Sequence, residues 1–499
     1  MSSAEAGLAA GACRLRLTNE AGASALACAL ARSYAAALGF DERGLAQIEL
    51  GVEEAVSNVV RHAFAPDELQ HFDVTLQRHV LGLEILIDDQ GLPFDPTRVT
   101  AYDPAREPQA QVEAGLGMHL MRSAFDEVEY RNLGRGGKQT RLLKYHALEP
   151  IGERVLPAEV GTSDDAIAAI RPLREEDALE VSRLIHDAYG YSYPYEHIYF
   201  PERVIALNRS GALQSALAVT GTGRIAGHAA LVSDPERPER AELAIVVTRT
   251  QYRGQGVARR LGDHLLDVAY QRGLRLLFTN AVTAHPYTQR FMHELGFRDC
   301  ALLPGHAPAS LRFRRIAESL PQRESCMLAV RYLDASAQTP RRITAAPTQR
   351  AALQAIYAGL GIPLQWIMAE HAGASLPAHG SMDAALHAGL ELAQLRIVRW
   401  GEDSLPLLRA RLAQLRRERM AVVELEVPLA DAHSARMSDA LEALGFVFSG
   451  IWPGTTPAED QLIYNHVADP GFDYDALKIH SDLGQRLRTM MREHGTPAA

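Results

Sequence analysis

The chain has 499 residues and carries 51 Lys and Arg against 61 Asp and Glu, a formal net charge of −10. Its length predicts about three domains, and its acidic balance argues against nucleic acid, whose phosphates need a basic surface. No apolar run approaches the ~18–20 residues that cross a bilayer, and the start of the chain lacks a signal-peptide pattern, so we expect no membrane partner. Four scattered cysteines favour reduced thiols in the cytoplasm.

Residues 1–146 are predicted to form an α+β domain. The alternation of apolar and polar residues in Cys13–Leu17 predicts a strand, and helical spacing follows it. In chain order we expect a strand at 13–17, helices at 22–38 and 42–63, strands at 72–78 and 83–89, a helix at 116–125, and strands at 127–132 and 139–145.

The helix at 42–63 carries the first group of candidate site residues. Glu54, Asn58 and His62 are spaced four apart and share one stripe of the helix. The amide oxygen of Asn58 suits Mg²⁺, a hard cation that takes further oxygens from a nucleotide. Glu54, one turn earlier, can accept a proton from an attacking hydroxyl or water. His62 is more simply a polar helix residue.

A second group of candidates follows the strand at 83–89. The Asp89 carboxylate can accept the exocyclic amine of adenine, and Gly91 lets the backbone approach the base. Gly115 and Gly117 precede an expected helix, whose first amides can hold phosphate oxygens. Together these residues predict an ATP site.

This ordered set resembles the GHKL ATPase superfamily, and within it the anti-sigma-factor serine kinases. The resemblance implies that Glu54 is the catalytic base, Asn58 the magnesium ligand, Asp89 the adenine contact, and Gly115 with Gly117 the phosphate loop. It also implies a protein partner of the anti-anti-sigma (STAS) or sigma-factor type. One departure is Pro93, which stands where the family pattern has a second glycine.

A second nucleotide-type loop lies far downstream, after the apolar, β-branched run Leu243–Val247, which predicts a buried strand. A glycine-rich loop then opens a helix, which presents backbone amides to a pyrophosphate. We assign this cofactor-binding stretch to Val247, Gln251, Arg253, Gly254, Gln255, Gly256 and Ala258.

That stretch resembles the pyrophosphate loop of the GNAT acyltransferases, and the likeness spans about residues 168–334. It implies acetyl-CoA as the cofactor, an amine as the acyl acceptor and a mixed-sheet fold, with His285 at a cofactor position often held by asparagine. Glu242 is the best candidate for the catalytic base. Met292 stands where the family often has a tyrosine that protonates the leaving thiolate. Tyr287 or a water are the alternatives for this proton donor.

The tyrosine-rich run Tyr189–Phe200 lies where substrate loops are expected in that family. Its rings, with Glu196, can hold a cationic amine. An aromatic anchor for a neighbouring domain explains the run equally well.

The rest of the chain contains two linkers and a partial repeat. Residues 147–165 and 335–345 have linker composition. Leu295-Gly-Phe297 before Pro304-Gly305 recurs as Leu444-Gly-Phe446 before Pro453-Gly454. We therefore predict a GNAT domain at 166–334 and a degenerate GNAT-like domain with a C-terminal helix at 346–499.

The sequence thus predicts an α+β multidomain protein, in which a GHKL-type sandwich is followed by a GNAT mixed sheet and a second GNAT-like unit. The leading functional hypothesis is a bifunctional regulatory protein, an N-acetyltransferase fused to a serine kinase. An ATP-gated binding module with little turnover is the main alternative, favoured by Pro93 and Met292. In a third hypothesis only the transferase is active and ATP is an allosteric signal.

Overall fold

The computed structural model describes most of the chain, and the statements below concern the described residues, which are 12–65, 68–79, 82–92, 113–133, 136–146, 165–234, 237–308, 322–334, 339–367, 375–387 and 390–494. Contacts divide the chain into two compact units. Unit 1 comprises residues 1–150 with 379–386 and 406–419, and unit 2 comprises the remainder. Within the described ranges, no helix has the length and apolar character needed to cross a membrane.

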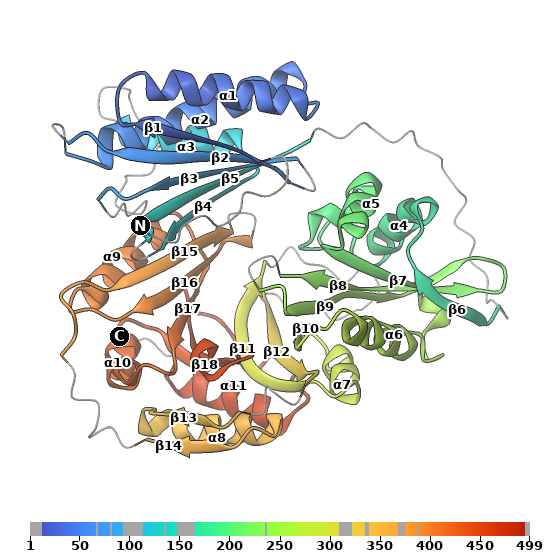
Figure 1. Cartoon of the computed structure of the whole chain (residues 1–499). Helices are drawn as coiled ribbons and strands as arrows, with labels where there is room; N and C mark the ends of the chain where they lie inside the picture. The colour runs from blue at the N-terminus through green and yellow to red at the C-terminus, as the bar shows by residue number, and fades with distance from the viewer. Residues whose placement is uncertain are drawn as a thin grey trace. The chain divides into compact units, whose positions relative to one another are not determined.

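The first 150 residues of unit 1 build a sheet with helices on one face (Figure 1). Each strand pairs antiparallel with its neighbours in the order β1-β2-β3-β5-β4. The strands are β1 (Cys13–Thr18), β2 (His71–His79), β3 (Gly82–Asp89), β4 (Glu127–Asn132) and β5 (Lys138–Tyr145). The helices are α1 (Ala23–Ala37), α2 (Glu42–His62) and α3 (Glu113–Ala124).

Helix α2 is central to this part because its apolar stripe enters the core. The Asp41 side chain caps it by accepting a hydrogen bond from Gly44 N at 2.8 Å. Its buried residues pack with alternate residues of β2 and β3 in one hydrophobic cluster. The predicted α+β elements are all present, with boundaries shifted by a few residues.

The middle region of unit 2, residues 165–334, is one mixed sheet covered on both faces (Figure 1). Strand order is β6-β7-β8-β9-β10-β12-β11, and only the β9–β10 pair is parallel. The elements are β6 (Ile167–Pro172), α4 (Ala178–Tyr189), α5 (Pro201–Ser210), β7 (Leu213–Thr220), β8 (Ile225–Ser233), β9 (Arg240–Thr248), α6 (Val257–Gln271), β10 (Leu276–Val282), α7 (Tyr287–Glu294), β11 (Arg298–Ala307) and β12 (Glu324–Tyr332). One core forms against α6 and another against α4.

The C-terminal region, residues 339–494, repeats part of that strand pairing. β16 and β17 pair in parallel, β17 pairs antiparallel with β19, and β18 pairs antiparallel with β19. The elements are β13 (Arg341–Ile343), α8 (Pro347–Leu360), β14 (Leu364–Trp366), β15 (Ser381–His387), β16 (Leu392–Arg399), α9 (Ser404–Arg417), β17 (Val422–Pro428), α10 (Ala432–Ala443), β18 (Val447–Trp452), β19 (Gln461–Val467) and α11 (Asp482–His494). Most of β15 and of α9 belongs to unit 1, and the other elements belong to unit 2. Strand β13 lies inside the stretch 335–345 that we predicted to be a linker.

Within unit 2, the middle and C-terminal regions meet where β11 pairs with β18, through Ala301 and Gly450. Each strand carries an irregularity at that point, because the β11–β12 register shifts before Ala301 and the β18–β19 register shifts before Gly450. A side chain at Gly450 would collide with the Cys300 carbonyl and with Ala301. The glycine therefore permits the close approach of the two strands.

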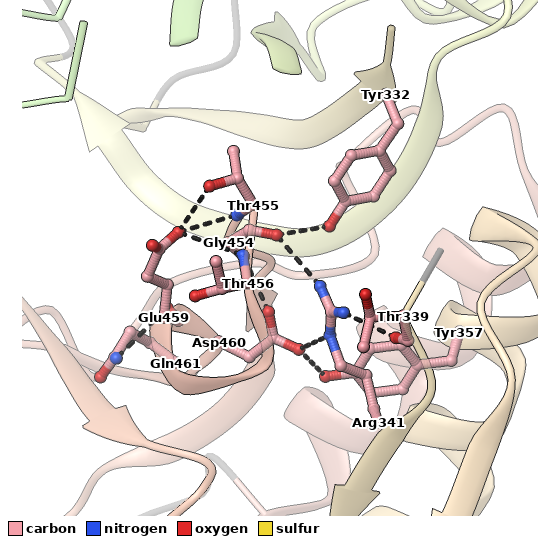
Figure 2. Close-up of polar contacts among 10 residues, drawn as sticks. All are labelled: Tyr332, Thr339, Arg341, Tyr357, Gly454, Thr455, Thr456, Glu459, Asp460 and Gln461. Carbon is pink, nitrogen blue, oxygen red and sulfur yellow. Dashed lines mark hydrogen bonds and ion pairs between the residues drawn. The ribbon is translucent and has the colours of Figure 1, made fainter. Parts of the chain in front are cut away.

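A buried polar network also joins the two regions (Figure 2). The Arg341 and Asp460 side chains are 0% and 1% exposed and form an ion pair at 2.7 Å. The Tyr357 hydroxyl donates to Asp460 Oδ2 at 2.6 Å. The Gly454 carbonyl accepts from Arg341 at 3.1 Å and from the Tyr332 hydroxyl at 2.8 Å. Because every charged group has partners, this network can be buried without leaving an uncompensated charge.

Candidate functional site

In unit 1, α2 presents Glu54 and Asn58 beside α3. Both side chains are half-buried. A Cβ atom at Gly117 would lie 2.5 Å from Glu54 Oε2, so the glycine leaves room for this carboxylate. The structure therefore brings Glu54 to the α3 segment that contains the predicted phosphate loop.

The position of that loop differs from the prediction. Helix α3 begins at Glu113, so Gly115 and Gly117 lie inside the helix and do not precede it. The amide of Gly115 is still among the first-turn groups that lack an intrahelical partner, whereas Gly117 is one turn further in. Residues 93–112, which include Pro93, lie outside the described residues.

Asp89 ends β3 as a buried carboxylate with a side-chain exposure of 2%. Its Oδ1 accepts from Gly91 N at 3.0 Å and pairs with Lys138 Nζ at 2.9 Å. Lys138 Nζ also donates to the Leu92 carbonyl at 2.7 Å. A side chain at Gly91 would collide with the Ala63 carbonyl, which explains the glycine there. Lys138 was not among our site residues, although it lies in the glycine-flanked start of β5.

In the middle region of unit 2, the glycine loop has the predicted form. Gly254 and Gly256 have φ of +79° and +70°, and nothing lies within 4 Å of a Cβ built at either position. Gly256 is the N-cap of α6, and its carbonyl accepts the first helical hydrogen bond, from Arg260 N. The amides of the first three helical residues, which include Ala258, thus have no intrahelical acceptor.

The other predicted loop residues surround these glycines. Gln251, Arg253 and Gln255 are exposed, so the Arg253 guanidinium is available to phosphate oxygens. Val247 is buried near the end of β9, where it pairs with His228. The loop has the donors, the cation and the space that a pyrophosphate requires.

Before this loop, the β9–β10 pair, which is the parallel pair among the described strands of the middle region, separates. β9 and β10 pair at Leu276–Arg240, Leu277–Ala241 and Phe278–Glu242, and the ladder stops there although both strands continue. Ile245, three residues further along β9, has a left-handed φ of 55°. Its N–H donates to the Tyr193 hydroxyl at 3.2 Å, and its carbonyl accepts from His228 Nδ1 at 2.9 Å. The strands therefore separate at Glu242.

Glu242 sits at the start of this split and is 7% exposed. Its Oε2 accepts a hydrogen bond from the Tyr195 hydroxyl, and its Oε1 accepts from Asn280 Nδ2 at 3.1 Å. Burial raises the pKa of the Glu242 carboxyl above its ordinary value, although Tyr195 and Asn280 favour the charged form. Deprotonation of an ammonium group requires a base, and the raised pKa makes this carboxylate a stronger one.

Two partners of Glu242 were not predicted individually. Tyr195 belongs to the tyrosine-rich run, where neighbouring rings pack in pairs, with 4.7 Å between the centroids of Tyr189 and Tyr193. Tyr195 is thus the residue of this run that bonds Glu242, whereas the predicted Glu196 is exposed. Asn280 lies within β10, and no sequence motif marks it.

The corner between β10 and α7 holds His285, which is 4% exposed. The Glu324 carboxylate accepts from the backbone N–H groups of Thr283 and Ala284 at 2.8 and 3.0 Å and so fixes this corner. Met292 is buried in the core against α6. Tyr287 is 64% exposed and its ring centroid lies 5.3 Å from that of His285.

Comparison with known families gives a match for each of the two regions that contain these candidate sites. The family described as Histidine kinase-like ATPase domain matches residues 17–144, and the Acetyltransferase (GNAT) family matches residues 179–297. The chain therefore joins a histidine kinase-like ATPase domain to a GNAT-family acetyltransferase domain. Membership in these families implies an ATP site in the first and an acetyl-CoA site in the second.

The ATPase domain is similar to proteins named Serine-protein kinase RsbW. The relative from Oceanobacillus iheyensis is 27% identical over 135 residues, which are 26% of this chain and 78% of that protein. The relative from Bacillus licheniformis is 31% identical over 98 residues, covering 19% of this chain and 61% of that protein. The acetyltransferase domain is similar to the solved ribosomal-protein-S18-alanine N-acetyltransferase from Escherichia coli, with 18% identity and a TM-score of 0.27, covering 33% of this chain and 94% of that one.

Proposed function

We propose that this protein is a bifunctional regulatory enzyme of the cytoplasm, an acetyl-CoA-dependent N-acyltransferase fused to a serine kinase of the anti-sigma-factor type. The main support is one coincidence in the acetyltransferase domain. From Glu242 onward β9 is separated from β10, and the open glycine loop at the start of α6 follows the far end of β9. One ligand can therefore place a pyrophosphate on the loop and a thioester between the strands.

In the proposed acyl transfer, Glu242 holds the ammonium group of the acceptor and takes one of its protons. The N–H electron pair stays on nitrogen, which attacks the thioester carbonyl. A C–N bond forms, the C–S bond breaks, and the thiolate leaves with the electron pair and takes the second proton. Met292 is apolar and buried, so the described residues offer no acid at that position, and we assign this proton to the nitrogen itself or a water.

In the proposed kinase reaction, Asn58 would hold Mg²⁺ and Asp89 would accept the adenine amine. Glu54 would take the proton of a serine hydroxyl as that oxygen attacks the terminal phosphorus. The amides at the start of α3, including that of Gly115, would hold phosphate oxygens. By its likeness to anti-sigma-factor kinases, we propose an anti-anti-sigma or sigma-factor protein as partner.

The second candidate function is an ATP-gated binding module with little turnover. Its support is the Lys138 ammonium, which already pairs with Asp89 at the predicted adenine contact. A bound nucleotide would have to share Asp89 with the Lys138 ammonium or displace it. Nucleotide binding would therefore be linked to the conformation around Lys138.

Radiolabel transfer separates the two candidates. The full chain is incubated with labelled ATP and Mg²⁺, or with labelled acetyl-CoA, in a bacterial lysate. Transfer of each label supports the bifunctional enzyme, and ATP binding without phosphate transfer supports the gated module. The Glu54→Ala variant should bind ATP as the wild type does and transfer no phosphate, since a base acts in the transition state. Loss of ATP binding in that variant would contradict the catalytic role of Glu54.

A further inference from the structure

Glu242 is a buried carboxylate whose hydrogen-bond partners in the described part of the chain are neutral side chains. The Tyr195 hydroxyl donates to Oε2, and Asn280 Nδ2 donates to Oε1 at 3.1 Å. Burying a carboxylate is costly unless a cation or hydrogen-bond donors compensate its charge. Two donors from different elements therefore converge on one carboxylate, to which the ammonium group of an acceptor would bring the missing positive charge.

Tyr195 can only donate to this carboxylate. Burial, and then the charge of Glu242, raise the pKa of the Tyr195 hydroxyl well above its ordinary value, so the hydroxyl keeps its proton. The tyrosine-rich run is also bonded to β9 at Ile245, whose N–H donates to the Tyr193 hydroxyl at 3.2 Å. Tyr193 N in turn donates to the Tyr199 hydroxyl at 2.9 Å. The run is thus attached to β9 at two points, three residues apart along the strand.

Asn280 approaches Glu242 from β10. It lies two residues beyond Phe278, the last residue of β10 that pairs with β9. Because a carboxylate accepts hydrogen bonds, the amide turns Nδ2 toward Glu242. Its Oδ1 is buried and has no hydrogen-bond partner among the described residues. An unbonded buried oxygen destabilises a fold, so stability alone does not explain an amide at this position.

We propose that Tyr195 and Asn280 are positioning residues of the acyl transfer, which hold the Glu242 carboxylate in one orientation toward the acceptor's ammonium group. This inference rests on the proposed acetyltransferase function. Each residue bonds a different carboxylate oxygen, so rotation of the carboxylate would break both bonds. Both bonds also favour the charged form, which is the form that accepts a proton. Because Tyr195 belongs to the tyrosine-rich run, the position of that run is linked to the state of the base.

These two bonds give the reaction a characteristic pH dependence. Only ionised Glu242 accepts the proton, so activity falls as the pH is lowered through its pKa. Loss of either bond removes a contact that favours the ionised form, so it raises that pKa and moves the acid limb of the rate profile to higher pH. The titratable groups that interact electrostatically with Glu242 are Tyr193 and Tyr195 of the tyrosine-rich run, His306 on β11 and Cys326 on β12.

The test uses the full chain, acetyl-CoA and a panel of primary amines, namely n-butylamine, L-lysine and a peptide mixture with free N-terminal amines. Release of CoA thiol gives kcat and kcat/KM for the amine at each pH. The ionisation of the amine itself is common to all variants, so differences between variants report a group of the enzyme.

Tyr195→Phe and Asn280→Ala should each move the acid limb upward by about one pH unit, as loss of a hydrogen bond to a charged group does. Each should lower kcat by about 10-fold, a part of what a positioned base contributes, with the KM for acetyl-CoA unchanged. Tyr270→Phe is the matched control, because Tyr270 is 49% exposed on α6. It should give the wild-type profile.

A second measurement separates positioning from folding. The Glu242→Gln enzyme has no base to position, so adding Tyr195→Phe to it should leave the residual kcat within about 2-fold. The loss of about 10-fold should therefore be seen only where Glu242 is present. An equal loss in both backgrounds would show that Tyr195 acts independently of Glu242 and would overturn its positioning role.

The other outcomes distinguish this inference from the function on which it rests. An acid limb that stays in place in both Tyr195→Phe and Asn280→Ala would overturn the positioning roles. Binding of acetyl-CoA without transfer to any amine of the panel would also overturn them, because no ammonium group would then meet Glu242. Failure of the wild type to bind acetyl-CoA would instead overturn the proposed acetyltransferase function.

Discussion

The parallel pairs β9–β10 and β16–β17 begin alike and end differently. In the acetyltransferase domain the ladder stops after its third residue pair, Glu242 with Phe278. In the C-terminal region the third pair is Gln394 with Glu424, and two further pairs follow, ending at Arg396 with Glu426. We name these the open pair and the closed pair. In the described residues, the backbone ladder stops early in the open pair and continues in the closed pair.

The chemistry changes at the same register position. Gln394 stands where the open pair has Glu242, and an amide cannot act as a base at neutral pH. The carboxylate lies on the opposite strand instead, as Glu424, where the open pair has Phe278. Its partner is His306 of the acetyltransferase domain. The comparison suggests that the closed pair has no reaction of its own.

The largest expected effect comes from breaking the junction that holds the closed pair in place. Asp460→Ala leaves Arg341 buried without its counter-charge, which typically costs about 3–5 kcal/mol. Urea denaturation should show this loss in the free energy of unfolding. Asp475→Ala removes an exposed ion pair with Arg492 and should change stability by no more than about 1 kcal/mol. Equal effects of the two changes would contradict the structural role of the network.

Exchanging the third pair tests its chemistry. Glu242→Gln should lower kcat by about 10²–10⁴-fold, the usual contribution of a positioned base, while acetyl-CoA binding by calorimetry stays as in wild type. Burial raises the pKa of Glu242. As the pH is lowered, Glu242 should therefore become protonated, and activity should fall, at a higher pH than for an ordinary carboxyl group. Gln394→Glu should not create a second active site. A Glu242→Gln enzyme of wild-type activity would remove Glu242 as the base.

A substitution in the glycine loop should lower stability by a smaller amount and should abolish acetyl-CoA binding. Gly256→Val forces a branched residue into left-handed φ, at a cost of about 1–2 kcal/mol. Gly211→Val is the matched control, since Gly211 has φ +77° and the same open surroundings at the end of α5. Both should lower the Tm. Only Gly256→Val should lose the Tm increase that acetyl-CoA gives the wild type. A retained increase would contradict the pyrophosphate assignment.

The smallest expected effect concerns the side-chain ion pair at the end of the closed pair. Arg396 Nε bonds Glu426 Oε2 at 2.6 Å across the last register pair of β16 and β17, with side-chain exposures of 32% and 16%. Arg396→Met should cost only about 0.2–1 kcal/mol, because the backbone ladder keeps the strands together. Hydrogen exchange of the β17 amides should stay slow. Fast exchange there would show that the side-chain pair closes the strands.

Local patterns predicted much of the fold and many of the candidate residues. The periodicity of 42–63 predicted α2, and Gly254 with Gly256 predicted a loop that opens a helix, which is observed as α6. The predicted α+β fold class, with GHKL-type and GNAT-type parts, is confirmed. The start of α3 was wrong by a few residues because glycines alone do not set a helix boundary. The site roles of Glu54, Asn58, Asp89, Glu242 and His285 stay predictions.

The sequence by itself determined the elements, their order and the residue types that two nucleotide sites need, because these depend on neighbours within a few positions of the chain. Only the tertiary structure decided which distant groups meet. Lys138 reaches Asp89, Tyr195 reaches Glu242, and Glu424 reaches His306 across 118 positions. Hydrogen bonds and ion pairs act over a few ångströms, so such partners are fixed by strand register and sheet order, which no local pattern contains.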